Sequence, residues 1–286
     1  MIQRIAILGT GLLGTSVGLA LRAGGFSGSI VGWNRGSPGA EQALAMHAID
    51  SVAIDPQEAA RGAEVTLLAV PIYATLDLME RLAGVLGPDQ LLTDVGSTKG
   101  QITAAAARLF NTRERAAFLP GHPMAGKERG GAELADANLF RGAVWLFTDD
   151  PAWQRSKTGA ALVKDWRELV AAMGSRLIDI DPARHDEMVA WVSHLPQFTA
   201  TALSALLEDE VGDAPELKDV GGRALREMTR LGASPFSMWR DIAATNTAAI
   251  ERALLALEQR LQHIRENLRT PALREEFERA NKFRQG

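Results

Sequence analysis

The chain has 286 residues, a length that favours two domains over one. Lys and Arg number 31 and Asp and Glu 35, and the net charge of -4 argues against a nucleic-acid-binding protein, whose binding face is normally basic. The chain has no cysteine, which excludes disulfides, thiolate catalysis and cysteine-ligated zinc or iron–sulfur centres. It has neither an apolar run near the roughly 18 residues that span a bilayer nor an N-terminal signal pattern. We therefore expect a cytoplasmic protein that binds neither nucleic acid nor membrane, and no metal site.

The first part of the chain, residues 1 to 181, alternates short apolar runs with amphipathic segments. The apolar runs predict strands over residues 5–9, 29–33, 64–71, 90–96, 116–121, 143–148 and 176–181. Between several of them lie helical patterns, such as LLGTSVGLALRAGG and YATLDLMERLAGVLG. Buried strands that alternate with helices predict an α/β domain whose parallel sheet is covered on both faces.

The second part, residues 182 to 286, differs in composition. Ala, Leu, Glu and Arg dominate, and the apolar residues recur every three to four positions, so we expect an all-helical domain. The stretch from 243 to 268 carries a wide apolar stripe made of Ile250, Leu254, Leu257, Leu261, Ile264 and Leu268. Such a stripe suits a helix of a second subunit, and packing within the same subunit accounts for it about equally well.

The sequence GTGLLG at residues 9–14 follows the first predicted strand and opens the first predicted helix. In a G-x-G-x-x-G loop the first glycine allows a tight turn, the second lets a pyrophosphate approach the backbone, and the third permits close helix–strand packing. The phosphates then lie at the positive end of the helix dipole. We predict a dinucleotide site here, with a glycine-rich turn in a non-binding domain as the alternative. Its expected contacts, which include the AVP loop after a later strand, are Gly9, Gly11, Leu12, Leu13, Gly14, Val70 and Pro71.

The residues after the second predicted strand indicate which dinucleotide binds. An NAD site usually has Asp or Glu at this point, which accepts a hydrogen bond from the ribose 2′-hydroxyl. This chain has Asn34, followed by Arg35 and, close by, Ser37. An uncharged side chain followed by a guanidinium suits a 2′-phosphate, which arginine binds bidentately. We therefore favour NADP over NAD, although Arg35 could equally be a solvated loop charge.

Histidine is the usual group that takes a hydroxyl proton during hydride transfer, because its pKa lies near neutral pH. His122, in PGHPMAG, lies just past a predicted strand, at the carboxyl end where ligands of open α/β sheets bind. His194, in VSHLPQ, precedes Pro196, which we expect to interrupt the helix and free a backbone carbonyl. A turn histidine that caps a carbonyl and a histidine satisfied between helices are the respective alternatives. We interpret the remaining histidines as surface residues: His47, His185 and His263.

Two other groups of polar residues are candidates for the site. Ser97, in TDVGSTKG, follows another predicted strand at the same edge, where it could orient an imidazole or bond the substrate. Capping the following helix is its alternative role. An acidic substrate would need arginines from the helical part, although most helical arginines are solvated; the candidates are Arg223, Arg226, Arg230 and Arg240.

The motifs GTGLLG, TDVGSTKG, GHPMAGKERGG, VSHLP and MTRLGASPFSMWRDI, in this order, resemble the prephenate/arogenate dehydrogenase family of tyrosine biosynthesis over essentially the whole chain. The resemblance implies a Rossmann-type dinucleotide-binding domain, a helical dimerisation domain, an active site between them, and a homodimer. It also implies oxidative decarboxylation of prephenate to 4-hydroxyphenylpyruvate, or of arogenate to tyrosine, with NAD(P) as the hydride acceptor. The change of composition agrees with this layout, so we divide the chain into residues 1–181 and 182–286.

The resemblance further implies roles for individual residues. His122 matches the catalytic histidine, which bonds the ring hydroxyl of the substrate and takes its proton, and Ser97 matches the serine that orients this histidine. Glu128 matches an acidic residue that orders the active-site loop. His194 matches a histidine close to the substrate, and Arg230 matches the arginine that binds a substrate carboxylate.

One departure from the family pattern keeps both substrates open. Some members carry a second histidine at the position of Gln197, whose amide can bond a keto or amino side chain but cannot carry a positive charge. A second enzyme interpretation is a 3-hydroxyacid dehydrogenase or imine reductase, which relies on a lysine of the helical domain. Only Lys218 lies in the middle of that domain, within a charged run. A nucleotide-sensing regulator without catalysis is the third interpretation.

Overall fold

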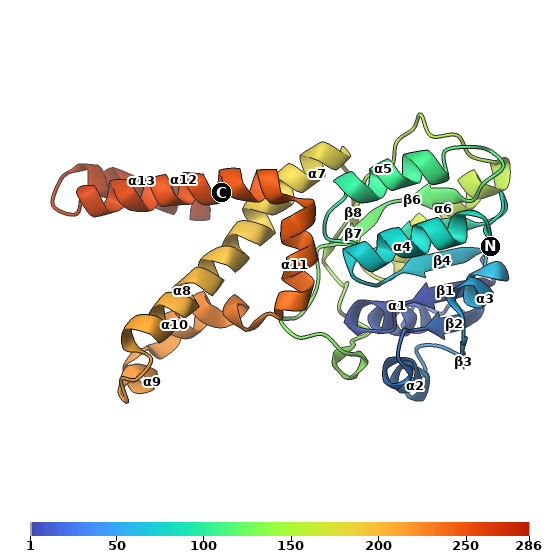
Figure 1. The fold of residues 1–286 in the computed structure, drawn as a ribbon, viewed down its shortest axis with the longest axis horizontal. Coiled ribbons are helices and arrows are strands. Elements are labelled where there is room, and N and C mark those ends of the chain that lie inside the picture. The colour runs from blue at the N-terminus through green and yellow to red at the C-terminus, as the bar shows by residue number, and fades with distance from the viewer. Residues whose placement is uncertain (1, 286) are drawn as a thin grey trace.

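The computed structural model describes residues 2–285, apart from the side chains of Ser37 and Lys218. An α/β domain contains the strands, and the helices of the last third of the chain extend from it as two arms (Figure 1). The strands are β1 (Arg4–Leu8), β2 (Ser29–Trp33), β3 (Ser51–Val52), β4 (Val65–Leu68), β5 (Leu91–Asp94), β6 (Ala117–Leu119), β7 (Gly121–Pro123), β8 (Val144–Phe147) and β9 (Arg176–Asp179). The helices among them are α1 (Leu12–Ala23), α2 (Ser37–Ala45), α3 (Pro56–Arg61), α4 (Ile72–Ala83), α5 (Gly100–Leu109), η1 (Ala132–Leu134) and α6 (Lys157–Ala172).

The main sheet has six parallel strands in the order β3-β2-β1-β4-β5-β6. The strand order reverses between β1 and β4, and in open α/β sheets ligands bind outside the carboxyl ends of the strands at such a point. This topology confirms the predicted Rossmann-type domain. It also brings the loops after β1, β4, β5 and β6 to one edge of the sheet.

A second sheet has three strands in the order β7-β8-β9. The predicted strands at 143–148 and 176–181 belong to it, so the expectation of a single parallel sheet is wrong for them. The predicted strand at 116–121 divides at Pro120 into β6 and β7, and β7 runs antiparallel to β8. Proline has no N–H to continue a ladder, which explains the division. Strand β3 is missed by the sequence pattern because its two residues are exposed.

The main sheet is buried on both faces, as the strand patterns predict. Ile5 and Ile7 of β1 point into the core beneath α1 and α6, whereas Ala6 and Leu8 point into the core beneath α3, α4 and α5. Successive side chains of a strand point to opposite faces, so a strand covered by helices on both sides has no polar face. The sheet is therefore a rigid support for the loops at its carboxyl edge.

The C-terminal domain is helical, as expected. Its helices are α7 (Pro182–Val189), η2 (Ala190–His194), α8 (Leu195–Val211), α9 (Leu217–Val220), α10 (Gly222–Thr229), η3 (Arg230–Ala233), α11 (Phe236–Thr245), α12 (Thr247–Glu266) and α13 (Ala272–Gln285). The expectation that Pro196 interrupts the helix is wrong, because α7, η2 and α8 follow one another without a break. The η2 segment is a turn of π-helix, which absorbs the missing N–H of the proline in the first turn of α8.

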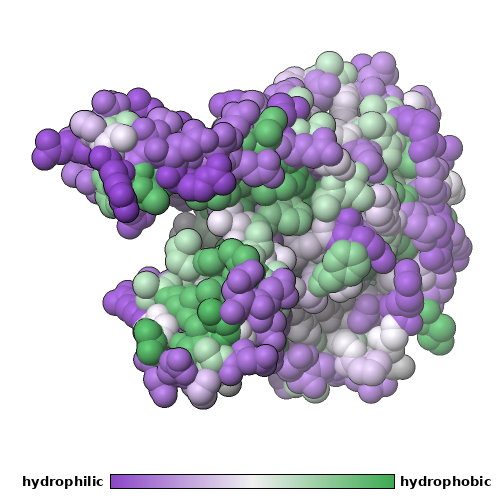
Figure 2. Space-filling view, turned by 60° about the vertical axis from the view of Figure 1, so that its left-hand side comes forward, coloured by the Kyte–Doolittle hydropathy of each residue, from purple (hydrophilic) through white to green (hydrophobic). Residues whose placement is uncertain are grey.

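The two arms of the helical domain leave apolar side chains uncovered. Figure 2 shows a hollow between the arms, with apolar residues gathered on the arm formed by α8, α9 and α10. Leu206, Val220 and Met228 are more than half exposed there, and so is Leu261 of α12, a member of the predicted stripe. Ile250, at the other end of the stripe, is buried within the subunit. Among residues 2–285 no helix combines the length and apolar character that crossing a bilayer needs.

Candidate active site

The glycine loop between β1 and α1 can be formed only by glycine at two positions. Gly9 has a φ of 106°, and a Cβ there would lie 2.3 Å from the Ala69 carbonyl oxygen. A Cβ on Gly14 would lie 1.9 Å from the Gly9 carbonyl oxygen. Val70 lies against the same loop, since its Cγ1 would be 2.6 Å from a Cβ on Gly9. The AVP loop and the glycine loop are therefore neighbours, with Pro71 at the start of α4.

The N-terminus of α1 fits the phosphates of a dinucleotide. Gly11 is the N-cap residue and supplies no side-chain hydrogen bond, so no described side chain caps the N–H groups of the first turn, which begins at Leu12 and Leu13. A Cβ on Gly11 would meet no atom within 4 Å, so the loop is open on that side. Uncapped N–H groups and the helix dipole together attract an anion.

The residues after β2 include no carboxylate that would bond a ribose hydroxyl. The amide oxygen of Asn34 accepts a hydrogen bond from the Arg35 N–H at 3.1 Å. The Asn34 nitrogen lies against α2, where it would be 2.5 Å from a Cβ on Gly39. Arg35 is exposed and forms no ion pair with any residue in the described range. The side chain of Ser37, a further predicted contact, lies outside what the structure describes.

His122 lies on β7, at the edge of the main sheet where the loops meet. The strand is held against the end of β5, because the Gly121 N–H donates to Asp94 Oδ1 at 3.1 Å and Lys99 Nζ donates to the Gly121 carbonyl at 2.7 Å. A Cβ on Gly121 would lie 2.8 Å from both the Asp94 carbonyl oxygen and Trp145 Nε1, so only glycine fits. The backbone that carries the His122 imidazole is therefore rigidly fixed.

Lys99 and Asp94 form a fully buried ion pair beneath this strand. Their side chains have no exposed surface, and Nζ lies 2.5 Å from Oδ2. Burial lowers the pKa of Lys99, and the charge of Asp94 opposes this shift. The sequence interpretation missed Lys99, although it stands in TDVGSTKG beside Ser97. An acid and a base on either side of a glycine turn at the end of a buried strand could have indicated the pair.

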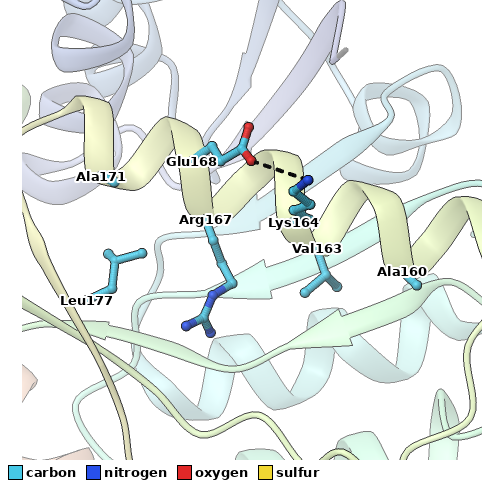
Figure 3. Close-up of a pocket in the computed structure, with 7 residues that line it drawn as sticks. All are labelled: Ala160, Val163, Lys164, Arg167, Glu168, Ala171 and Leu177. Carbon is cyan, nitrogen blue, oxygen red and sulfur yellow. Dashed lines mark ion pairs between the residues drawn. The ribbon is translucent and has the colours of Figure 1, made fainter.

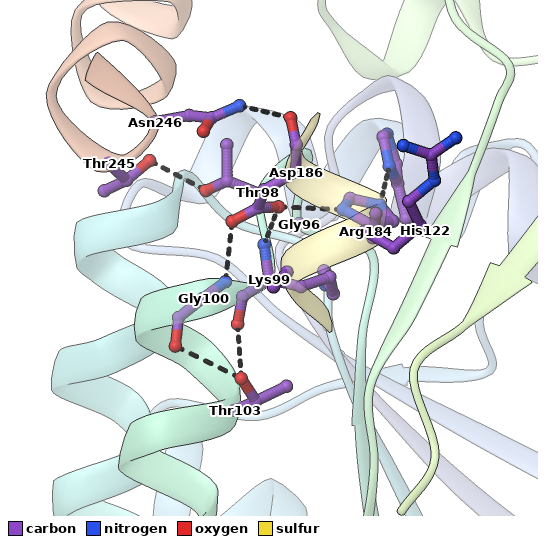
Figure 4. Close-up of polar contacts among 12 residues, drawn as sticks. Gly96, Thr98, Lys99, Gly100, Thr103, His122, Arg184, Asp186, Thr245 and Asn246 are labelled. Atoms are coloured by element: carbon purple, nitrogen blue, oxygen red, sulfur yellow. Dashed lines mark hydrogen bonds and ion pairs between the residues drawn. The ribbon is translucent and has the colours of Figure 1, made fainter. Parts of the chain in front are cut away.

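His122 is the first member of a hydrogen-bonded chain of three side chains (Figure 4). Its Nδ1 lies 2.9 Å from His185 Nε2, and His185 Nδ1 lies 2.8 Å from Asp186 Oδ1. The carboxylate of Asp186 also accepts the N–H groups of Lys99 at 2.7 Å and Gly100 at 2.8 Å, at the start of α5. The interpretation of His185 as a surface residue is wrong: it is 0% exposed, because α7 packs onto α5.

The His122 imidazole is neutral near pH 7. Burial lowers its pKa well below the ordinary value, and the nearby His185, Lys99 and His194 lower it further. Burial also lowers the pKa of His185, against the effect of its hydrogen bond to Asp186. A neutral imidazole can accept a proton from a substrate hydroxyl, whereas an imidazolium cannot.

The other predicted substrate contacts lie on the helical domain or face it. His194 is 1% exposed and lies 3.4 Å from the amide of Asn246, with its ring edge-on to Trp239. Arg230 of η3 forms an ion pair with Glu128, which follows β7. This pair joins the loop after His122 to the helical domain.

Two predicted residues differ from the sequence expectation: the structure shows no bond from Ser97 to His122, both of them described residues, and it gives Gln197 partners that the sequence does not indicate. Ser97 lies in the loop between β5 and α5, partly exposed, and no hydrogen bond joins it to His122 within the described structure. The Gln197 amide nitrogen donates to Thr201 and to the Leu231 carbonyl, and its oxygen accepts from Ser234. Gln197 thus links α8 to η3, and one acceptor position of its amide is left for a ligand.

A pocket of about 360 Å³ on α6 is not the active site (Figure 3). Its charged residues are already paired within the chain: Lys164 with Glu168, and Arg167 with Asp179. The Arg167 guanidinium also lies over the Phe147 ring. No histidine or unpaired acid lines this pocket, so it lacks the convergent reactive groups of a catalytic site.

Comparisons with known proteins show which family the chain belongs to. The family model for the nucleotide-binding domain of prephenate dehydrogenase matches residues 17–179, and the model for its dimerization domain matches residues 181–282. The chain belongs to the prephenate dehydrogenase family. This membership confirms the resemblance and makes the chain an NAD(P)-dependent dehydrogenase of the prephenate/arogenate type. The hydroxyacid dehydrogenase, imine reductase and regulator interpretations are thereby set aside.

Individual relatives align over nearly the whole chain. The prephenate dehydrogenase of Lactococcus lactis is 28% identical over 99% of this chain and 77% of that protein. The prephenate dehydrogenase of A. aeolicus, solved with hydroxyphenyl propionate and NAD+, is 27% identical with a TM-score of 0.83, covering 100% of this chain and 96% of that one. Arogenate dehydrogenase of Synechocystis is also 27% identical, with a TM-score of 0.77 and 99% of both chains covered.

The burial of His194 predicts a loss of stability in acid. Burial lowers its pKa from 6.5 to about 4, so below pH 6.5 the unfolded chain binds a proton that the folded chain does not. Stability contributed by this histidine is complete above pH 6.5 and is lost as the pH falls toward 4. We measure the free energy of unfolding in urea at pH 7 and at pH 4.5. Between these two pH values, the free energy of unfolding of His194→Asn should fall by about 2–3 kcal/mol less than that of the unmodified protein. His263→Asn, at an exposed position, should lose as much as the unmodified chain; equal losses in all three proteins would contradict the prediction.

Proposed function

We propose that this protein converts prephenate to 4-hydroxyphenylpyruvate by oxidation and decarboxylation, with His122 as the proton acceptor. The observation that carries the proposal is a buried, neutral imidazole at the ligand edge of the Rossmann sheet, in a chain of the prephenate dehydrogenase family. A nicotinamide ring, when bound, accepts the hydride from the carbon that bears the hydroxyl. The ring carboxylate of the substrate leaves as CO2, and the ring becomes aromatic.

The work of His122 is to accept and return one proton. Nδ1 of His122 is engaged by His185, so Nε2 is the nitrogen left for the substrate hydroxyl. Taking the hydroxyl proton lets the C–O bond gain double-bond character as the hydride leaves. When the electrons of the departing carboxylate enter the ring, the oxygen takes the proton back and becomes a phenol. The step consumes no base overall.

Arg230 is our candidate for binding a substrate carboxylate. Its side chain is 62% exposed, and its guanidinium has planar N–H groups that match two carboxylate oxygens. Glu128, its partner in this structure, would hold the arginine at the site and order the loop after β7. We assign Arg230 to the side-chain carboxylate, because neutralising the ring carboxylate firmly would oppose its loss as CO2.

The remaining contacts are assigned by their position. Ser97 lies in the loop between β5 and α5, from which we propose that it contacts the substrate hydroxyl. His194 lies beside Asp186 at the same place, since the amide nitrogen of Asn246 is 3.4 Å from His194 Nδ1 and also donates to the Asp186 carbonyl. Gln197 has one acceptor position left, which suits the amino group of arogenate as well as a water bound to the keto group of prephenate.

We propose NADP as the favoured cofactor and a homodimer as the working unit. Asn34 and Arg35 support the first proposal, because a 2′-phosphate would find a guanidinium with no ion-pair partner among the described residues, and no carboxylate directly after β2. The dimerization domain of the family and the exposed apolar side chains on both arms support the second. Location in the cytoplasm stays a prediction from composition.

The activity is tested by mixing the protein with prephenate or arogenate and with NAD or NADP. We expect absorbance of the reduced cofactor at about 340 nm with at least prephenate, and a loss of about 10²-fold or more in kcat for His122→Asn, the usual scale of a positioned base. His47→Asn is the matched control, because His47 is exposed with a φ of 58°, a conformation that Asn tolerates. No absorbance change in any of the four mixtures would refute the function.

The role of Arg230 predicts a change in substrate affinity. Arg230→Ala should raise the KM for prephenate about 10- to 100-fold, the range that a hydrogen-bonded charge contributes, with a smaller effect on kcat. The KM of Arg230→Lys should lie between those of the unmodified protein and Arg230→Ala, because a lysine keeps the charge without the planar pair of donors. Arg108→Ala, which removes another exposed and ion-paired arginine, is the control. An unchanged KM for Arg230→Ala would exclude the proposed contact.

The identity of residue 34 predicts the cofactor ratio. Asn34→Asp should repel a 2′-phosphate and accept a hydrogen bond from a 2′-hydroxyl, so kcat/KM should shift toward NAD relative to NADP by about 10-fold or more, equivalent to ~1.4 kcal/mol. Asn267→Asp, at the end of α12, makes the same chemical change far from β2 and should leave the ratio unchanged. A ratio unaffected by Asn34→Asp would mean that this residue does not face the ribose.

A further inference from the structure

The chain of side chains behind His122 ends in a carboxylate that can only accept hydrogen bonds. Asp186 Oδ1 receives the Lys99 N–H and faces His185 Nδ1, while Oδ2 receives the Gly100 N–H. Although burial raises the pKa of Asp186, the hydrogen bonds from His185 and from the two backbone N–H groups hold it below its ordinary value. The carboxylate is therefore ionised, and an ionised carboxylate has no proton to donate.

An ionised carboxylate at the end of the chain decides the position of every proton in it. His185 Nδ1 must carry a proton, because it faces an acceptor at 2.8 Å. His185 is neutral, so its Nε2 is a bare acceptor. His122 Nδ1, 2.9 Å from that acceptor, must then be the donor of the next hydrogen bond. A neutral His122 with a proton on Nδ1 has none on Nε2.

We propose that Asp186 and His185 are positioning residues that hold His122 in the Nδ1–H tautomer and so present Nε2 to the substrate as a proton acceptor. The proposal rests on the function assigned above and names the residues that prepare its base. Neither residue touches the substrate; both act through His122. Within the described residues no side chain or backbone group bonds Nε2 of His122, which leaves it available.

The same arrangement persists while His122 carries the substrate proton. An imidazolium has an N–H at both nitrogens, so Nδ1 continues to donate to His185 and only Nε2 changes. No hydrogen bond behind the base has to break or rotate during the reaction. A site whose dipoles are already oriented does not reorganise as charge develops.

A purely structural role would have different consequences. If His185 only filled space between α7 and β7, any residue of similar size would serve, and the His122 tautomer would not depend on it. If the hydrogen bonds from Asp186 through His185 set the tautomer of His122, a hydrogen-bond acceptor is needed at the position of His185 Nε2. Gln can provide an acceptor oxygen there, whereas Phe fills the space and provides none.

Nitrogen NMR of protein labelled with ¹⁵N-histidine tests the tautomer without any substrate. The signals of His122 are identified by their loss in His122→Asn. We expect the Nδ1–H tautomer in the unmodified protein, a mixture of tautomers in His185→Phe, and the Nδ1–H tautomer again in His185→Gln. His47→Asn should leave the His122 signals unchanged. A His122 protonated on Nε2 in the unmodified protein would overturn the proposal, whether or not the activity is found.

Kinetics of the same variants provide the second measurement. We expect kcat to fall about 10- to 100-fold in His185→Phe, with KM nearly unchanged; removing the hydrogen-bonding partner of a metal-bound histidine has an effect of this size. His185→Gln should recover part of the loss. If His185→Phe and His185→Gln have equal kcat values and the tautomer of His122 is unchanged in both, His185 has only a packing role and the proposal is wrong. If His185→Phe does not fold, the tautomer of the unmodified protein and of His185→Gln still decides the question.

Discussion

The carboxylate of Asp186 is the contact on which the arrangement of the site depends. It belongs to the first helix of the helical domain, yet it accepts the backbone N–H groups of Lys99 and Gly100 at the start of α5 in the Rossmann domain. The backbone carbonyl of Asp186 accepts a hydrogen bond from the side-chain amide of Asn246, at the start of α12. One residue therefore connects α5, α7 and α12. Because a helix N-terminus attracts negative charge, the contact is favourable for both domains.

The Rossmann domain holds the backbone of His122 in place, and the helical domain supplies the side chains that form hydrogen bonds with its imidazole. Strand β7 is fixed from below by the buried pair of Lys99 and Asp94, which bonds both backbone groups of Gly121. A buried pair of this kind is costly to break, because each partner alone would be an unpaired charge in the interior. His122 is thus carried by a backbone that cannot shift, while His185 and Asp186 arrive from α7 to determine its hydrogen bonding.

Features that depend on neighbouring residues could be predicted from the sequence, and features that depend on distant ones could not. The glycine loop could be predicted because its strand, turn and helix are contiguous in the sequence. The change of composition near residue 181 is likewise visible in adjacent residues. His185 was misassigned because its partner, His122, is 63 residues away and its own helix reads as charged and solvated. The second sheet was missed for the same reason: apolar alternation predicts a strand but not the sheet that it joins. The Asp that follows His185 was the available signal, since an acid beside a histidine can fix its tautomer.

The interposed His185 resolves a conflict between orienting a base and keeping it unprotonated. A carboxylate bonded directly to His122 would orient the ring, but its charge would raise the pKa of the imidazole and favour the protonated form before substrate arrives. A neutral ring between them transmits the hydrogen-bond direction, and the interaction of the two charges weakens with the added distance. Burial and the positive Lys99 then keep the pKa of His122 low. Asp186 therefore orients the His122 imidazole through His185, while its negative charge acts mainly on the pKa of His185 and less on that of His122.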